Sequence, residues 1–235
     1  MKYSLILGLG LLMSGQVYAS AVVPGSSEFE LRDPKTKEVY FTGSETVSIN
    51  GETARRETSY FDSGKKEVQK DLFDFNASSL SAGAFNSLNK LTGEETSVAR
   101  LDSGMEVGYR DSGAKNLGKT VVKASEEGYL ANSAGDLILA NWDRLIAGKA
   151  IKFNLLIPSR AEYIPFQLVR RETTTVNGEQ REVFSLMPQN LLIRMLAPHL
   201  EFQFNKDKKI RQAVFPTSLP IKGAKDKMVE MVFKG

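Results

Sequence analysis

Turn signals at short intervals constrain the fold of this chain more than any other feature. Asn50-Gly51 separates alternating runs at residues 39–49 and 52–61, and Asn177-Gly178 does the same further along the chain. A two-residue Asn-Gly loop between alternating segments is the strongest short-range signal of a β-hairpin. Because hairpins join antiparallel strands, we expect most of the chain to form an antiparallel sheet.

An Asp-Ser-Gly tripeptide occurs three times, beginning at Asp62, Asp102 and Asp111. Asp favours the start of a turn, and Gly takes its left-handed position without steric cost. The tripeptides lack the alternating Asp and Asn ligands of a calcium loop. They therefore predict three further turns and no metal site.

The main helical pattern lies in the middle of the chain. Four apolar residues mark one face of a helix expected over residues 133–147: Ile138, Trp142, Leu145 and Ile146. Ser133 and Asp136 have the spacing of a capping box, with Asp in place of the usual Glu. Gly148 stands where a left-handed C-cap belongs, so the helix should end there.

After Gly148 the period changes from helical to two. Residues 151–157 alternate as a strand, and residues 164–168 restart the alternation after Pro158. Pro165 lies inside this second strand, which favours an edge position or a bulge there because proline cannot donate to a ladder.

Two further segments have helical spacing. Residues 188–196 are expected to form a second short helix, with an apolar stripe of Leu191, Leu192, Met195 and Leu196. Residues 78–91 are ambiguous, because Gly83 weakens an otherwise helical pattern. The fold class is therefore expected to be mainly β. We predict an antiparallel meander of about eleven to thirteen strands, forming a curved sheet or incomplete barrel with one central helix on its concave face.

The first residues have the features of a secretory signal peptide. Lys2 supplies a positive n-region, residues 5–13 are apolar, and small residues precede candidate cleavage sites after Ala19 and Ala21. The apolar stretch is too short to span a membrane. We predict a signal peptide at residues 1–19, a single antiparallel β domain at residues 20–235, and export to the periplasm.

Composition disfavours several classes of function. The chain has 31 basic and 28 acidic residues and a net charge of +3, which gives no electrostatic footprint for nucleic acid. There is no cysteine, and His199 is the only histidine, so Cys-His zinc sites and Cys-His catalytic pairs are excluded. We expect no enzyme, no cofactor, no nucleic-acid partner and no transmembrane span in the mature chain.

The candidate ligand-binding residues are Trp142, Phe153, Phe166 and Arg160. Trp142 lies on an apolar helix face, where a tryptophan is more often core than a ligand platform. Arg160 follows the end of the first strand and is placed at a rim. Two basic pairs, beginning at Arg55 and Arg170, lie in strands, where neighbours face opposite sides. For these pairs we favour a solvated face with one internal salt bridge.

The pattern Trp142-x2-Leu145-x2-Gly148, followed by Ile151-x-Phe153, resembles an exported Gram-negative protein family of unknown function. Over residues 59–222 the layout is similar to antiparallel half-barrels of the periplasm. It is distantly similar to the lipoprotein-carrier and lipid-binding half-barrels of the envelope. The resemblance implies a curved antiparallel sheet and no catalytic residues, and lipid binding follows from it only as an analogy of fold.

Two functions remain open. The first is a soluble periplasmic binding or carrier module for an apolar or lipid-like ligand. The alternative is an envelope structural or assembly factor that binds protein partners through a sheet edge. An outer-membrane barrel is disfavoured by the expected helices and by the lack of aromatic girdles. An exposed apolar cavity would favour the carrier, whereas a filled core with a bare strand edge would favour the assembly factor.

Overall fold

A computed structural model describes residues 22–196, 200–221 and 228–234 of the chain. Its strands are β1 (Gly25–Arg32), β2 (Val39–Asn50), β3 (Thr53–Phe61), β4 (Glu67–Asn76), β5 (Ala82–Asn89), β6 (Glu95–Leu101), β7 (Gly104–Arg110), β8 (Gly118–Val122), β9 (Gly128–Tyr129), β10 (Ile151–Ile157), β11 (Glu162–Val176), β12 (Glu179–Pro188), β13 (Leu200–Asn205), β14 (Ile210–Pro216) and β15 (Met228–Phe233). Its helices are η1 (Ala131–Ser133), α1 (Ala134–Ala140), α2 (Trp142–Ile146), η2 (Pro158–Arg160) and α3 (Leu191–Leu196).

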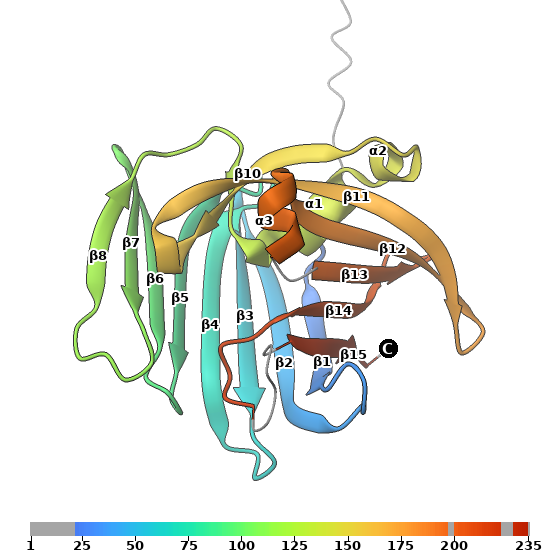
Figure 1. Ribbon diagram of the computed structural model, residues 1–235, viewed down its shortest axis with the longest axis horizontal. Helices are drawn as coiled ribbons and strands as arrows, with labels where there is room; N and C mark the ends of the chain where they lie inside the picture. The colour runs from blue at the N-terminus through green and yellow to red at the C-terminus, as the bar shows by residue number, and fades with distance from the viewer. Residues whose placement is uncertain (1–21, 197–199, 222–227, 235) are drawn as a thin grey trace, which may run out of the picture.

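These strands form one sheet in the order β8-β7-β6-β5-β4-β3-β2-β1-β15-β14-β13-β12-β11-β10-β9. Sequence neighbours pair antiparallel along almost the whole order, and only β9 and β10 run parallel. The prediction of a mainly β fold built as an antiparallel meander is therefore confirmed (Figure 1).

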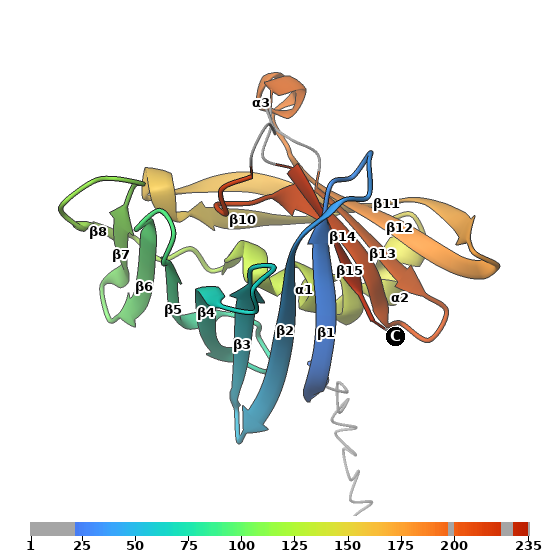
Figure 2. The same ribbon diagram turned by 90° about the horizontal axis from the view of Figure 1, so that it is seen from below.

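The sheet curves back over its own helices. Strands β1–β8 form one layer, strands β9–β15 cross it as a second layer, and α1 lies between the two (Figure 1 and Figure 2). The layers are joined where β1 pairs with β15, with Leu31 opposite Met231. At the far side η2 contacts β6 and β7, which brings the two ends of the curve together. The result is a barrel-like sheet with a helix on its concave face, as predicted.

Apolar side chains fill the space between the layers. The largest fully buried side chains are Phe29, Phe73, Phe75, Phe184, Phe204, Leu31, Met105, Ile138, Leu145, Leu156, Leu168 and Leu186. They come from both layers and from both central helices, and they belong to one contiguous cluster. Because burial of apolar surface is the dominant favourable contribution to folding, this cluster is what holds the two layers and the helices together.

The two Asn-Gly hairpins are both present, but their turns differ. In the β11–β12 loop, Asn177 and Gly178 have φ values of 52° and 81°, as a type I′ turn requires. In the β2–β3 loop the two turn residues are Gly51 and Glu52, with Gly51 at φ 59°. The hairpin prediction is confirmed, and the first loop lies one residue later than Asn50-Gly51 indicates.

The Asp-Ser-Gly segments form turns, as predicted. The Oδ1 atom of Asp62 accepts hydrogen bonds from the backbone N–H groups of Gly64 and Lys66 at 2.9 and 3.0 Å. Gly113 has φ 77°, the left-handed conformation that its position in the turn predicts. These aspartates therefore stabilise loops.

The central helix is placed as expected, but it is not continuous. The helix predicted over residues 133–147 is divided into α1 and α2 at Asn141, which has φ −116° and ψ 18°. The Asn141 side chain donates to the carbonyl oxygen of Leu137 at 2.9 Å, a local bond that competes with regular helix. The predicted capping box was wrong, because Ser133 makes no side-chain cap and Asp136 binds an arginine instead.

The C-terminal end of this helical unit agrees with expectation. Gly148 has φ 78°, and the Lys149 N–H donates to the Arg144 carbonyl at 2.9 Å, as in a Schellman motif. Leu145 is fully buried, but Ile146 is 38% exposed, so its assignment to the apolar face was wrong. The break at Asn141 changes the angular position of the α2 residues relative to α1. The adjacent residues Leu145 and Ile146 therefore differ in burial.

Pro165 lies in β11, an interior strand of the sheet order, and its register against β10 is continuous. The last pair between β11 and β12 is Phe166 with Pro188. Pro165 therefore lies just beyond the β12 ladder, at a local edge, where its missing N–H is tolerated.

Fifteen strands exceed the predicted eleven to thirteen. The ambiguous segment at residues 78–91 contains strand β5, so its helical spacing was misleading. β1 was not predicted, because Gly25-Ser26-Ser27 has the composition of a loop. Its two inward side chains, Phe29 and Leu31, are nevertheless fully buried. β9 has only two residues, too few to leave a pattern.

Candidate functional site

A buried ion cluster joins α1 to the inner face of β2 and β3. Arg56 Nη2 donates to both carboxylate oxygens of Asp136, at 3.1 and 2.9 Å, and Arg56 Nη1 donates to the Asn132 carbonyl at 2.6 Å. Arg56 Nε lies 3.5 Å from a carboxylate oxygen of Glu45 without hydrogen-bond geometry. The guanidinium carbon lies 5.5 Å from the centre of the Phe75 ring. These contacts fix α1 against the N-terminal layer.

The cluster places two carboxyl groups beside one guanidinium. Burial raises the pKa of both Glu45 and Asp136 above their ordinary values, although the charge of Arg56 acts in the opposite direction on each. A buried charge is tolerated only while it is paired, so each member depends on the others. The charged groups of this cluster contact one another, so the cluster has a structural role: it holds α1 against β2 and β3.

The first arginine pair agrees with the strand alternation, whereas the second lies at a register shift between Arg170 and Glu172. Arg55 lies on the outer face and forms an exposed ion pair with Asp74 at 2.6 Å, whereas Arg56 points inward. In the second pair, Arg170 binds Glu182 at 2.7 Å. The interpretation of a solvated face with an internal salt bridge is confirmed for the first pair.

Asp71 on β4 is a buried carboxyl group outside this cluster. Ser87 Oγ and Gln69 Nε2 donate to its Oδ1 at 2.6 and 3.0 Å. Burial raises the pKa of Asp71, although hydrogen bonds from Ser87, Gln69 and Tyr60 act in the opposite direction. Ser218 Oγ donates to Gln69 at 3.2 Å, so the segment that leads from β14 towards β15 is tied to this network.

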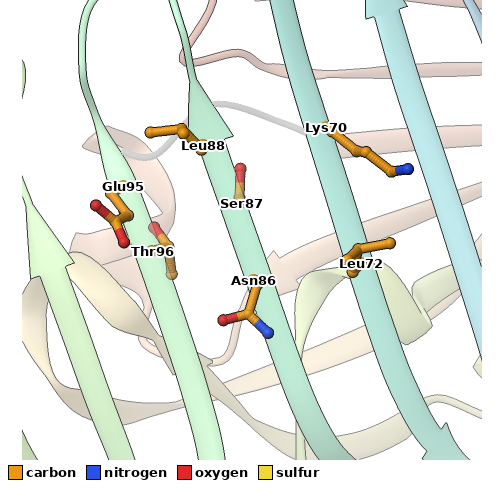
Figure 3. A pocket seen from close by; sticks show the side chains of 7 residues that line it. All are labelled: Lys70, Leu72, Asn86, Ser87, Leu88, Glu95 and Thr96. Atoms are coloured by element: carbon orange, nitrogen blue, oxygen red, sulfur yellow. The ribbon is translucent and has the colours of Figure 1, made fainter.

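The two best-defined hollows in the part of the chain that the structure describes are small and open to solvent. One, of about 180 Å³, lies on the outer face of β4–β6 (Figure 3) and is lined by Lys70, Leu72, Asn86, Ser87, Leu88, Glu95 and Thr96. The other, of about 200 Å³, lies beside β10 and is lined by Glu127, Tyr129, Leu137, Asn141, Arg144, Ile151, Lys152 and Phe153. Pockets for small molecules typically enclose roughly 300–1,000 Å³. Neither hollow is an enclosed apolar cavity.

Trp142, the first predicted ligand-binding residue, is a partly buried core residue. Its ring packs against Phe184 and Phe204, with centroid distances of 5.2 and 5.9 Å. Lys208 Nζ lies 5.4 Å from the centre of the indole on the other side. Trp142 therefore links α2 to the C-terminal layer.

The other three predicted residues lie elsewhere. Phe153 and Phe166 face each other on β10 and β11 and are both buried. Arg160 is exposed in η2 and forms an ion pair with Glu162. The structure brings only Phe153 and Phe166 together, and ligand binding by the four residues stays a prediction.

Sequence reasoning missed the inward-facing polar residues Glu45, Asp71 and Asp136. A signal for Glu45 and Asp71 existed, because each alternates with a buried apolar residue two positions later, Val47 and Phe73. His199 and the predicted signal peptide lie outside the described residues. Within those residues no group of acidic or histidine side chains could hold a metal ion. None of the helices described is long and apolar enough to cross a membrane.

The two ends of the sheet differ. β9 is very short and pairs with Asn154 and Leu155 of β10. At the other end β8 pairs with β7 along one edge, and no strand within residues 22–196, 200–221 and 228–234 pairs with its other edge. Four of its five residues are exposed. β8 therefore presents a free edge with unpaired backbone groups.

The short helix predicted after β12 exists as α3, but three members of its predicted apolar stripe are not buried. Leu191, Leu192 and Met195 are 66%, 73% and 77% exposed. α3 stands clear of both layers of the sheet (Figure 2). It is therefore a surface feature of the molecule.

Neither a protein-family model nor a curated protein matches this chain. Among solved structures, it is similar to the crystal structure of a β-barrel-like protein of the domain of unknown function DUF1849 from Brucella abortus. The TM-score is 0.55 and the sequence identity is 10%, over 90% of this chain and 95% of that one. This likeness shows a shared fold, and it agrees with a β domain of unknown function. It does not extend to the expected similarity with lipoprotein carriers.

Proposed function

We propose that this protein is a non-enzymatic module of the bacterial periplasm that binds an extended segment of an envelope protein along the free edge of β8. One observation carries the proposal: a bare strand edge belongs to a sheet whose concave face is filled by α1 and core side chains. The location follows from the predicted signal peptide at residues 1–19.

Strand addition uses chemistry that the edge already provides. An extended peptide satisfies the free N–H and C=O groups of the edge strand, and side-chain contacts on alternate positions supply specificity. The inward side chains of β7 and β8 include Met105 and Val122, which are buried and partly buried. A strand added beside β8 would extend this apolar inner surface.

Exposed lysines on and beside β8 favour an acidic partner. Lys115, Lys119 and Lys123 are all exposed, and Lys119 forms an ion pair with Glu106 at 2.8 Å. Two copies pairing through β8 would bring like charges together, which is unfavourable. The edge therefore favours an extended segment rich in Asp and Glu over a second copy of this chain.

The carrier function has weaker support. It requires an apolar cavity, and the two best-defined hollows among the described residues are small and open. The charged groups of the interior are also engaged with one another, as the contact between Arg56 and Asp136 illustrates. An apolar ligand would have to displace packed core side chains.

The test uses a photo-crosslinking residue in place of Val121, which is 53% exposed on β8. In intact cells it should capture an acidic extended segment of an envelope protein. The same residue in place of Leu101, 43% exposed on β6, should not capture it. The crosslinked peptide is identified by mass spectrometry.

Two proline variants then test the geometry. Successive N–H groups of a strand point to opposite edges, so Lys119→Pro and Thr120→Pro remove donors from opposite sides of β8. One variant should abolish the adduct with the melting temperature nearly unchanged, and the other should lower the melting temperature by breaking the β7 ladder. An adduct unaffected by either proline, or no adduct, would contradict strand addition.

A further inference from the structure

α3 gathers exposed apolar side chains in one place. Of the twelve large apolar side chains that are exposed in the described part of the chain, four lie on this single helix: Leu191, Leu192, Ile193 and Met195. Soluble proteins expose single apolar side chains routinely, but a contiguous group marks an interaction site. The feature is independent of β8 and of the function proposed for it.

Apolar side chains cover more than half of the circumference of α3. At 3.6 residues per turn, residues 191–193 span about 200° of the helix circumference, and Met195 falls within that arc. Arg194 lies on the remaining side, where its Nε donates to the Pro188 carbonyl at 3.0 Å and its Nη2 to the Gln189 carbonyl at 3.4 Å. The Arg194 guanidinium is therefore directed towards the N-terminal end of α3, near Pro188 and Gln189.

Three of the first four backbone N–H groups of α3 have acceptors on Asn190. Asn190 Oδ1 accepts from the N–H groups of Leu192 and Ile193 at 2.9 and 3.2 Å, and the Asn190 carbonyl accepts from the Arg194 N–H at 2.9 Å. Helix N-termini otherwise present unpaired N–H groups, which are unfavourable in an apolar medium. These bonds lower the cost of transferring the start of α3 from water into an apolar medium.

We propose that α3 inserts into the apolar boundary of a lipid bilayer and holds the protein on a membrane surface. A lipid layer needs no complementary shape, and it can surround an apolar arc of this width on all sides. The patch consists of four exposed side chains on one helix, whereas each side of a standard protein interface has roughly 20–30 residues.

Alternative occupants fit less well. A symmetric contact between two copies through α3 alone would bury too little area for a stable dimer. β1 begins on the side of the molecule opposite α3 (Figure 2), so the start of the described chain lies far from the patch. The lipid surface is the occupant that the geometry favours.

Vesicle flotation tests the proposal with the mature chain and vesicles of phosphatidylethanolamine and phosphatidylglycerol. The wild-type protein should float with the vesicles, and Leu192→Asp/Met195→Asp should reduce the bound fraction by about tenfold or more, since it places two charges in the apolar arc. The matched control is Leu91→Asp/Leu101→Asp, at side chains 49% and 43% exposed elsewhere. It adds the same charge and should float like the wild type.

Salt separates insertion from adsorption of a basic chain, whose pI is about 8.9. At about 1 M salt the Debye length falls to roughly 3 Å, so electrostatic adsorption is lost while apolar insertion persists. Flotation that disappears at this salt concentration, or that both double variants weaken equally, would overturn the proposal.

The absence of cysteine permits a second readout. A polarity-sensitive fluorophore on Met195→Cys should shift to the blue when vesicles are added, and the same label on Leu101→Cys should not shift. An unshifted label at position 195 would overturn insertion. Light scattering gives a further test. A wild-type dimer that Leu192→Asp/Met195→Asp converts to a monomer, and that vesicles do not change, would also overturn insertion. In that case a second copy of the chain would cover α3.

Discussion

The chain carries two apolar helical stripes, and the structure uses them in opposite ways. In α1 and α2, Ile138 and Leu145 have no exposed surface, because both lie between the layers of the sheet. In α3, Leu192 and Met195 are more than 70% exposed. Helical spacing of apolar residues therefore predicts a helix and its apolar face, but not what covers that face.

The two helical units also differ in their polar partners. α1 carries Asp136, and the sheet opposite it presents Arg56 and Glu45, so the helix is held by charge as well as by apolar contact. α3 has one charged residue, Arg194, and its guanidinium bonds to carbonyl groups at the base of α3 itself. No comparable bond from α3 to a distant strand is found among the described residues.

The largest expected effect is at the charge that holds α1. Asp136→Ala leaves Arg56 buried without its main partner, and breaking such a pair typically lowers the free energy of unfolding by roughly 3–5 kcal/mol. Urea denaturation measures the change. Replacing all three charges, as Glu45→Gln, Arg56→Met and Asp136→Leu, should recover most of the loss. A neutral Asp136→Ala would contradict the role of the cluster.

Next in size is the loss of a buried side chain from α2. Leu145→Ala should lower the free energy of unfolding by about 2–5 kcal/mol, through lost burial and the cavity left behind. Ile146→Ala is a matched control at the adjacent, exposed residue and should change it by less than about 0.5 kcal/mol. Equal losses at the two positions would mean that α2 is oriented differently.

The pH dependence of stability tests the buried carboxyl group of Asp71. Burial raises the pKa of Asp71 in the folded state above its ordinary value of 3.8, which it keeps in the unfolded state. At a pH between the unfolded-state and folded-state pKa values, the folded state therefore binds more protons than the unfolded state. The contribution of Asp71 to stability therefore falls as pH rises through this window. Measured from just above pH 3.8 to neutrality, the wild type should lose stability relative to Asp71→Asn. A constant difference between them would show that the pKa is not raised.

The smallest effect is expected at α3. Leu192→Asp/Met195→Asp should change the free energy of unfolding in water by no more than about 0.5 kcal/mol, as is usual for exposed sites. Thermal unfolding without vesicles provides the measurement. A loss of several kcal/mol would show that α3 packs against the protein, and it would remove the contrast with α2.

Features that depend on neighbours along the chain could be predicted from the sequence. The Asn177-Gly178 turn and the Gly148 stop follow from residues only a few positions apart, and both are present. The curved antiparallel sheet follows in turn from a succession of such hairpins.

Features that depend on distant partners could not be predicted. Arg56 and Asp136 are 80 residues apart, and the spacing of Asp136 from Ser133 indicated a local capping role instead. The pairing of β1 with β15 likewise joins the two ends of the described chain. The free edge of β8 depends on the order of strands in the sheet, which decides which strand lies at its end. The exposure of α3 depends in the same way on what the rest of the fold leaves uncovered.

Hydrogen exchange, resolved by peptide and measured with and without phospholipid vesicles, tests the contrast between the two helical units most directly. Amides of α1 should exchange only through global unfolding, both with and without vesicles, because this helix belongs to the packed core. Amides of α3 should exchange rapidly in solution and become protected when vesicles are added. The contrary result is rapid exchange in α1 that lipid slows, together with no change in α3. It would mean that the concave face opens to hold lipid and that the interior, rather than the outer surface, is the site of binding.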